Sequence, residues 1–506
     1  MTSDNHRDRP PATATCGSPP DGILRRAAML ALLSSVALSG CYNLRSSSGG
    51  AQAEFTPPRQ VRTNDVALPS DYRIEIIATG LTFPTAVAFD GEGIPHVVEA
   101  GYSYGELWTS PRWLRVETNG SVIPIATGRK NGPWTGVTYG DGHFYIAEGG
   151  ELDGGRILKV DERGQVTVLI ADLPTKGDHH TNGPAIGPDG HLYFALGTAT
   201  NSGIVGPDNA KFGWLKRKPT FHDVPCEDVS LTGESIASED PLSPDKKRVS
   251  IGAFVPFAQE TKRGQIIPGS IPCSGSILRI AREGGKPELV AWGFRNPFGL
   301  AFSADGQLYA TENGYDDRGS RPVWGTSDAL WRVKQGAWHG WPDFSAGEPL
   351  TDSRFRAPKG PAPKFLLAEH PNTPPKPVAL LGVHSSSNGF DFASATFGYE
   401  SQAFIAQFGD QAPTVGKVLS PVGFKIVRVD VSTGVVHDFA VNRGKVNGPA
   451  SKMGGAGFER PIAARFDPSG AALYVVDFGV LLETKQGTVP QQGTGVLWKI
   501  TRNAVP

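Results

Sequence analysis

Residues 185–197 read AIGPDGHLYFALG, which is an apolar strand, a tight turn and a second apolar strand that ends at glycine. The turn, Pro188-Asp189-Gly190, has the composition of a hairpin connection. Similar units recur along the chain, so this hairpin belongs to an internal repeat. The six copies lie at 86–101, 136–149, 185–197, 299–314, 390–409 and 463–479.

A second short pattern follows each hairpin: an aliphatic residue or tryptophan, then lysine or arginine, then valine or isoleucine. The copies are Leu114-Arg115-Val116, Leu158-Lys159-Val160, Leu278-Arg279-Ile280, Trp331-Arg332-Val333, Val427-Arg428-Val429 and Trp498-Lys499-Ile500. A repeated hairpin followed by a further strand is what a propeller blade requires. We therefore predict an all-β chain folded as a six-bladed β-propeller. We also expect the strand at 72–77 to close the ring beside 496–500, since closure covers exposed sheet edges.

Blade three is predicted to carry a long insertion. The chain runs from Tyr145 to Lys159 between the second and third strands of blade two, but from Tyr193 to Arg279 in blade three. The excess, residues 200–274, is expected to form a lid over one mouth of the ring. It contains Cys226 and Cys273, which can pair in an oxidising compartment and would then hold a polar insertion together.

Residues 1–41 have the character of a targeting segment. Arg25 and Arg26 precede an apolar run, 27–38, that is too short to span a bilayer. The run ends in Leu38-Ser39-Gly40-Cys41, which resembles a bacterial lipobox. We therefore expect a lipoprotein-type signal peptide with Cys41 as the lipidated residue.

The region after Cys41 would be a flexible tether over 42–67, followed by the propeller over 68–506. This organisation predicts export and lipid anchoring in the bacterial envelope, on the periplasmic side or in the outer membrane. The lipid on Cys41 would be the only contact with the membrane.

The composition narrows the function classes. Lys and Arg number 49 against 50 Asp and Glu, so no basic excess is available to neutralise a phosphate backbone, and nucleic acid is not an expected partner. The sequence has no Cys-x-x-Cys-His motif, which excludes a covalently attached c-type haem.

The repeat places polar residues on one face of the predicted ring. In a blade, the first strand starts and the second strand ends at the same face, so residues before first strands and after second strands surround one mouth. Those before first strands are Trp134, His179-His180, Arg295-Asn296, His384 and Arg460, and Asn313-Gly314-Tyr315-Asp316-Asp317 follows a second strand.

Four motifs in this set carry a family resemblance. They are His179-His180-Thr181-Asn182-Gly183, Gly293-Phe294-Arg295-Asn296-Pro297, Thr311-Glu312-Asn313-Gly314 and Gly340-Trp341-Pro342. In this order and at these gaps they resemble the soluble glucose/sorbosone dehydrogenases that depend on pyrroloquinoline quinone (PQQ). The likeness covers most of 68–506. It implies an enzyme that oxidises an aldose sugar or related alcohol with PQQ and Ca²⁺ and passes the electrons to an external acceptor.

The resemblance also assigns roles to residues. His179 would be the general base, with His180 as the alternative one position on. The residues that would contact the quinone are Arg295, Asn296, Asn313, Arg460 and Lys417. The family's lysine has no clear counterpart here, so Lys425 stands beside Lys417 as a second possibility. The backbone carbonyls of Gly314 and Tyr315 would hold the calcium ion.

Each residue type suits the chemistry that the resemblance implies. PQQ is a tricarboxylate, and arginine binds carboxylates through a planar fork. Calcium prefers oxygen ligands and would polarise a quinone carbonyl. A histidine can take the hydroxyl proton while hydride leaves the same carbon.

Two alternatives stay open from the residues alone: a calcium-dependent propeller hydrolase of lactonase type, and a binding propeller without catalysis. A mouth richer in arginine and histidine than in acidic residues favours a bound anion over the hydrolase.

Overall fold

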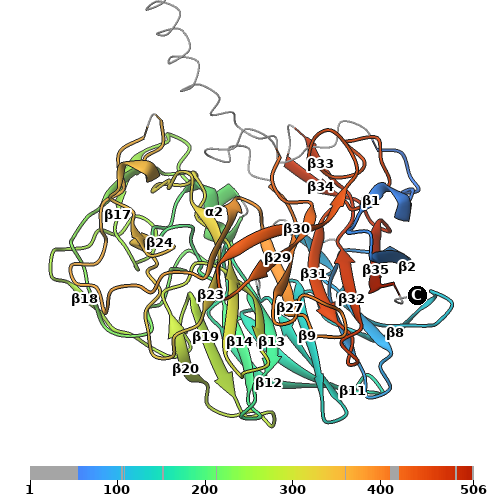
Figure 1. The fold of residues 1–506 in the computed structure, drawn as a ribbon. Coiled ribbons are helices and arrows are strands. Elements are labelled where there is room, and N and C mark those ends of the chain that lie inside the picture. Colours follow the sequence, from blue (N-terminus) through green and yellow to red (C-terminus); the bar gives the residue numbers. More distant parts are fainter. Residues whose placement is uncertain are drawn as a thin grey trace, which may run out of the picture. The chain divides into compact units, whose positions relative to one another are not determined.

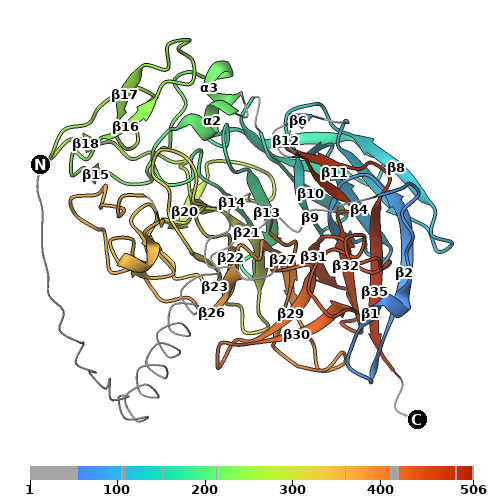
Figure 2. The ribbon, with the colours of Figure 1, turned by 90° about the horizontal axis from the view of Figure 1, so that it is seen from above.

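Six blades of antiparallel strands follow one another in chain order around a common centre (Figures 1 and 2). The computed structural model describes residues 55–503 apart from 104–105, 108, 151–152, 212, 359, 411–420 and 485–486. The predicted signal peptide, Cys41 and Lys417 lie outside the described residues.

The blades have nearly the boundaries that the repeat predicts. Blade one contains β3 (Pro84–Phe89), β4 (Pro95–Glu99), β7 (Arg112–Val116) and β8 (Val122–Thr127). Blade two contains β9 (Trp134–Gly140), β10 (His143–Glu148), β11 (Gly155–Asp161) and β12 (Val166–Leu173). Blade three contains β13 (Thr181–Ile186), β14 (Leu192–Leu196), β19 (Ser276–Ile280) and β20 (Glu288–Trp292).

The second half of the ring repeats this plan. Blade four contains β21 (Pro297–Phe302), β22 (Leu308–Glu312), β23 (Ser327–Arg332) and β26 (Ala379–Val383). Blade five contains β27 (Ser387–Phe392), β28 (Ala403–Gln407), β29 (Lys425–Asp430) and β30 (Val435–Asn442). Blade six contains β31 (Pro461–Phe466), β32 (Ala472–Asp477), β35 (Gly495–Arg502) and β2 (Tyr72–Leu81). The prediction of a six-bladed propeller is confirmed.

The ring is closed by strands from opposite ends of the chain. The innermost strands contact one another in the order β3, β9, β13, β21, β27 and β31, and β31 contacts β3. In blade six, β2 pairs with β35 so that Ile74 lies opposite Ile500. The expected closure is therefore confirmed.

The core lies between neighbouring blades because alternate residues of each strand face the next sheet. Val98 and Trp113 of blade one, for example, pack in one buried cluster with Val137 and Phe144 of blade two. Every blade thus depends on its neighbour for burial of apolar area, which is the main favourable contribution to folding.

The ordered fold begins earlier than residue 68. A short strand of two residues, β1 (Val66–Ala67), pairs with the outer strand β30 of blade five. Arg59 reaches blade six, where its guanidinium donates to Asp477, to the Thr494 carbonyl and to the Gly457 carbonyl. Part of the segment assigned to the tether therefore packs against the propeller.

The blade-three insertion has secondary structure of its own. It contains α2 (Pro207–Lys211), α3 (Trp214–Arg217), the pair β15 (Val229–Ser230) and β18 (Ile266–Ile267), and the pair β16 (Ile236–Glu239) and β17 (Arg248–Ile251). A disulfide joins Cys226 to Cys273, as expected. In the described part of the chain, no helix has both the length and the apolar character that a membrane span requires.

A second excursion, which the repeat pattern did not reveal, packs on the insertion. It runs between β23 and β26 and contains β24 (Phe344–Ser345) and β25 (Glu348–Pro349). Leu231 of the insertion forms a backbone bridge with Leu367 of the excursion, and both side chains lie in one buried cluster. Figures 1 and 2 show the two excursions together beside blades three and four.

Candidate functional site

Several second strands of the blades end in a residue whose carboxylate accepts a backbone N–H just before an inner strand. Glu312, the last residue of β22, accepts the backbone N–H of Arg295 at 2.5 Å. Asp477, the last residue of β32, accepts the backbone N–H of Arg460 at 2.8 Å. Burial raises the pKa of Glu312 to about 7. These acids anchor the backbone that presents the predicted site residues to one face.

The imidazole of His179 is held in one tautomer. Its Nδ1 lies 2.9 Å from the Thr198 carbonyl oxygen, and because a carbonyl only accepts hydrogen bonds, the proton sits on Nδ1 and the lone pair on Nε2. Burial, helped by the nearby charge of Arg295, lowers the pKa of His179 to about 3. The ring is therefore neutral at pH 7, with Nε2 3.7 Å from an oxygen of Asp178.

His180 lies against blade two, unlike His179. A Cβ placed on Gly149 of blade two would lie 3.1 Å from the Cβ of His180, whereas one on Gly197 would lie 2.2 Å from that of His179. Burial lowers the pKa of His180 to about 4. The two adjacent histidines thus lie against different blades, and His179 is the one beside Asn296.

The charged centre of the site is a group we call the arginine–aspartate network. Its members are Asp178, Asp208, Arg295, Asp316 and Arg318. Arg318 donates to all three carboxylates, with Nη1 2.6 Å from Asp208 and Nε 2.9 Å from Asp316. Arg295 Nη2 lies 2.8 Å from the same Asp316.

The network keeps two of its acids charged. Burial alone would raise the pKa of Asp178 and of Asp316, but Arg318 and Arg295 outweigh burial, and the pKa of each carboxyl is lowered. Asp208 differs, because burial outweighs Arg318 and raises its pKa. Asp178 and Asp208 stand outside the motifs, so the mouth holds more acidic groups than the sequence interpretation counted.

Arg295 is engaged with the protein on every side. Its Nε lies 3.1 Å from Asn201 Oδ1, and its Nη1 donates to the Gly314 carbonyl at 2.6 Å. Its side chain is only 4% exposed. Arg295 is therefore a buried residue that holds the loop after β22 in place.

Asparagine side chains link blades three, four and five. Asn182 donates to Asn296 at 3.2 Å, Asn296 donates to Asn313 at 2.8 Å, and Asn313 donates to the Ser387 carbonyl at 3.0 Å. The predicted residues Asn296 and Asn313 thus lie together beside His179 and Arg295.

Arg460 lies apart from this group. Its side chain is buried between the rings of Phe408 and Phe424, each centred 5.0 Å from the guanidinium carbon. Its Nη1 lies within 3.5 Å of the carbonyls of Phe408, Gly409 and Asp410. Of the two lysine candidates, Lys425 pairs with Asp438 on outer strand β30 at 2.6 Å.

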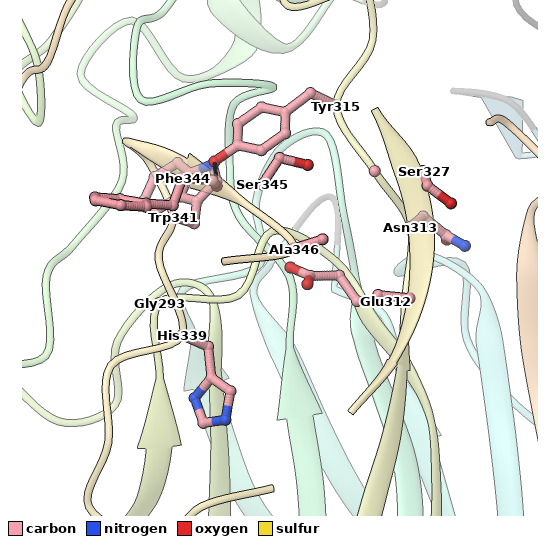
Figure 3. Close-up of a pocket in the computed structure, with 12 residues that line it drawn as sticks. Gly293, Glu312, Asn313, Tyr315, Ser327, His339, Trp341, Phe344, Ser345 and Ala346 are labelled. Carbon is pink, nitrogen blue, oxygen red and sulfur yellow. Dashed lines mark hydrogen bonds between the residues drawn. The ribbon is translucent and has the colours of Figure 1, made fainter. Parts of the chain in front are cut away.

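A small pocket lies beside the network (Figure 3). Its volume is about 10 Å³, and its lining includes Glu312, Tyr315, His339, Trp341 and Phe344. This space suits about one water molecule, so it is too small for a sugar or PQQ. Trp341 of the Gly-Trp-Pro motif lines this pocket.

Comparison with known proteins agrees with the architecture. The profile of the family described as Glucose / Sorbosone dehydrogenase matches residues 265–365. The chain resembles the glucose/sorbosone dehydrogenases. The matched range contains the Arg295-Asn296 and Thr311–Gly314 motifs, whereas His179 lies outside it. No curated protein matches.

Solved structures show the same fold at low identity. The iodide structure of a carbohydrate-active enzyme of family AA12 from Trichoderma reesei superposes with a TM-score of 0.52 and 16% identity, over 88% of this chain and 100% of that chain. The holo form of the pyranose dehydrogenase PQQ domain from Coprinopsis cinerea gives a TM-score of 0.52 and 15% identity, over 88% of this chain and 98% of that chain. At this identity, the likeness to the solved structures supports the propeller architecture alone.

The carbonyls that the glucose/sorbosone dehydrogenase resemblance assigns to calcium have other partners here. Gly314 O accepts from the Arg295 guanidinium at 2.6 Å, and Tyr315 O accepts from Thr326 Oγ1 at 2.8 Å. A divalent cation and a guanidinium at one oxygen repel each other. Among the described residues, no group of three or more His, Cys, Asp or Glu side chains is arranged to hold a metal ion. As arranged, these two carbonyls do not fit calcium.

The mouth does offer groups that fit PQQ. An acidic cofactor needs an accessible cation, and the side chain of Arg318 is 29% exposed, whereas Arg295 and Arg460 are buried. Arg318 and the amide of Asn296 would hold the cofactor in exchange for present partners, since Arg318 donates to three aspartates and Asn296 donates to Asn313. The sequence signal for Arg318 is weak, because its turn carries no motif and its three partners are scattered along the chain.

Proposed function

We propose that the chain is a PQQ-dependent oxidoreductase that oxidises an aldose sugar or a related alcohol. The observation that carries the proposal is His179. It is a buried neutral imidazole whose tautomer is fixed by the Thr198 carbonyl, and it stands beside an ionised Asp178 at the mouth of a propeller.

The residues support one proton-transfer step. His179 Nε2 takes the proton of the substrate hydroxyl, and the new imidazolium is stabilised by Asp178, whose carboxylate lies 3.7 Å away. PQQ, which Arg318 and Asn296 would hold, would supply the acceptor for the hydride, with its electron pair, that leaves the carbon becoming the carbonyl. Arg318 holds the Asp178 carboxylate in place. An external electron acceptor would complete the turnover.

The test is reconstitution of purified apo-protein with PQQ. We expect aldoses to bleach the absorbance of the bound oxidised quinone within one turnover. His179→Gln should keep PQQ bound and lose this reaction. No bleaching with any sugar or alcohol despite full PQQ occupancy would refute the proposal, and lactone hydrolysis without PQQ would support the hydrolase alternative.

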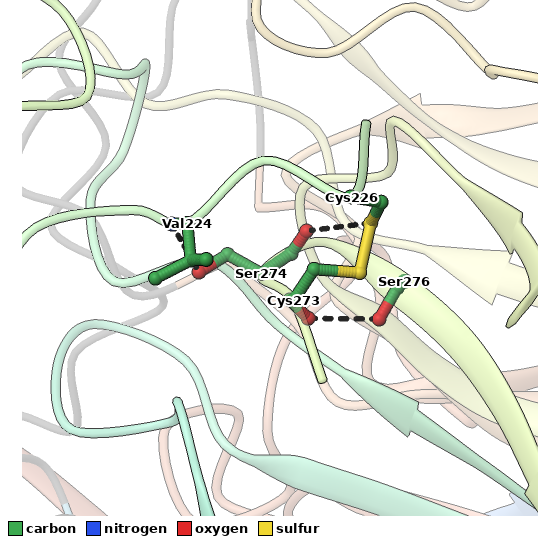
Figure 4. The surroundings of a disulfide bond; sticks show 5 residues. All are labelled: Val224, Cys226, Cys273, Ser274 and Ser276. Carbon is green, nitrogen blue, oxygen red and sulfur yellow. Dashed lines mark hydrogen bonds between the residues drawn. A yellow bond between two sulfur atoms is a disulfide. The ribbon is translucent and has the colours of Figure 1, made fainter. Parts of the chain in front are cut away.

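We also propose that the protein is exported and held on the membrane through a lipid on Cys41. The disulfide between Cys226 and Cys273 supports an oxidising compartment (Figure 4). A Cys41→Ser variant should move from the membrane fraction to the soluble fraction. Equal membrane retention of both forms would contradict the anchor.

A further inference from the structure

The loop that precedes β27 holds a strained histidine. His384 has a φ of 55° and Ser386 a φ of 50°, in the left-handed region that residues with a side chain rarely adopt. The turn is fixed from both sides, since Ser385 Oγ and the Ser387 N–H donate to Asp328 at 2.9 and 2.8 Å. Strain that the surroundings enforce is typical of functional sites.

The strain gives His384 one orientation. Its Nδ1 lies 3.3 Å from Asp316 Oδ1, and the other oxygen of Asp316 pairs with the guanidinium groups of Arg295 and Arg318 at 2.8 and 2.9 Å. In the neutral ring, Nδ1 therefore carries the proton and Nε2 the lone pair. The side chain is 10% exposed, and Nε2 is buried with no partner among the described residues.

His384 and His179 share the arginine–aspartate network. His179 stands beside Asp178, Arg318 donates to both Asp178 and Asp316, and Asp316 faces His384. The two imidazoles come from blades three and five, and Arg318 of blade four joins their carboxylates. The network thus contacts two imidazole rings rather than one.

Two side-chain oxygens near the starts of inner strands are also unpartnered. Asn182 Oδ1 and Asn388 Oδ1 are buried without a partner among the described residues. The amide nitrogen of Asn182 donates to Asn296 and that of Asn388 to Ser386 Oγ, so the oxygens are the unsatisfied ends. Like His384 Nε2, they accept hydrogen bonds. A ligand with several hydroxyl donors would satisfy them.

We propose that His384 binds a second hydroxyl of the substrate through Nε2, so that the site selects polyhydroxylated substrates over alcohols with one hydroxyl. This inference rests on the proposed function and names a specificity residue for it. His384 acts as a positioning residue, since the proton of the reacting hydroxyl goes to His179.

The test compares two substitutions that separate the ring nitrogens. His384→Asn keeps a group near Nδ1 but removes the acceptor at Nε2, whereas His384→Gln places an amide oxygen near Nε2. The matched control is His191→Asn. His191 also sits 3.3 Å from an aspartate, Asp189, but lies 37% exposed in a hairpin turn away from the mouth.

Binding of D-glucose to the apo-protein and to the PQQ-loaded protein is measured by ligand-observed NMR titration. Loss of one hydrogen bond predicts about tenfold weaker binding in His384→Asn. We expect His384→Gln to recover most of it and His191→Asn to match the wild type. In turnover, His384→Asn should raise KM for glucose more than KM for 1-propanol.

The outcomes are distinguishable. Glucose binding with this pattern but without reduction of PQQ would remove the proposed function and keep the role of His384 in sugar binding. Unchanged glucose affinity in His384→Asn, no glucose binding by the wild type, or a loss of PQQ affinity in His384→Asn would each overturn the inference.

Discussion

Substitution of Arg59 would measure how much the segment before the propeller contributes to the free energy of unfolding. Its Nη2 lies 2.6 Å from Asp477 Oδ2, and the two side chains are 4% and 0% exposed. Asp477 in turn accepts the backbone N–H groups of Glu459 and Arg460. The substitution Arg59→Met keeps most of the side-chain volume and removes the charge, leaving a buried carboxylate without its cation.

Breaking a buried ion pair in this way costs about 3–5 kcal/mol. The two backbone donors remain on Asp477 and stabilise its charge, so we expect a loss at the lower end, about 3 kcal/mol. The matched control is Arg62→Met. Arg62 pairs with Asp65 at 2.8 Å, but with side chains 57% and 27% exposed, so its loss should cost about 0–1 kcal/mol.

The assay is denaturant unfolding of both variants and the wild type, followed by circular dichroism and by tryptophan fluorescence. Arg59→Met should unfold at a clearly lower denaturant concentration than Arg62→Met. Equal midpoints for the two variants would refute the reasoning, because the buried pair would then contribute no more than an exposed one.

Three further predictions concern the site and the blade-three insertion. His179→Gln should slow reduction of bound PQQ by roughly 10²-fold to 10⁴-fold while His180→Gln has a much smaller effect, as stopped-flow absorbance at measured cofactor occupancy will show; the reverse order would move the base by one residue. A chelator of calcium should leave PQQ affinity unchanged, because the carbonyls of Gly314 and Tyr315 already have donors; a chelator-dependent loss that calcium restores would contradict this. Burial raises the pKa of Asp223 to about 7, against about 3.9 in the unfolded chain, so between these values the folded state binds more protons and stability should fall as pH rises. Between pH 4 and 7, Tm should therefore change less with pH in Asp223→Asn than in the wild type. An identical change of Tm with pH in both proteins would show that Asp223 does not titrate in this range.

The fold was predictable because its information is local and repeated. Each hairpin and each basic third strand shows in a short stretch of sequence, and the spacing between Tyr193 and Arg279 located the insertion. The packed segment around Arg59 escaped detection because it has no strand alternation and its partners are more than three hundred residues away. The excursion between β23 and β26 was missed for a similar reason.

The site was predictable where a motif carries it and hidden where partners come from separate loops. His179, Arg295, Asn296 and Asn313 were placed at the mouth by their position before or after strands, and the structure brings them together. Arg318 was missed because its role depends on three aspartates, two of which lie far from it in the sequence. The inward turn of Arg460 toward backbone carbonyls is also invisible in a sequence, since it depends on two aromatic rings that close over it.

The pairing of β2 with β35 sets the order of events during biosynthesis. β2 is made before the strands of blades one to five that lie between it and its partner, yet its hydrogen-bonding edge stays unpaired until residues 495–502 have been made. Closure is therefore a late contact between distant parts of the chain, and such contacts form slowly. A nascent chain that stops early leaves the ring open, with the apolar faces of its end blades exposed, and such species aggregate readily. An incomplete copy is therefore expected to differ from the complete protein in the apolar surface that its open ring exposes.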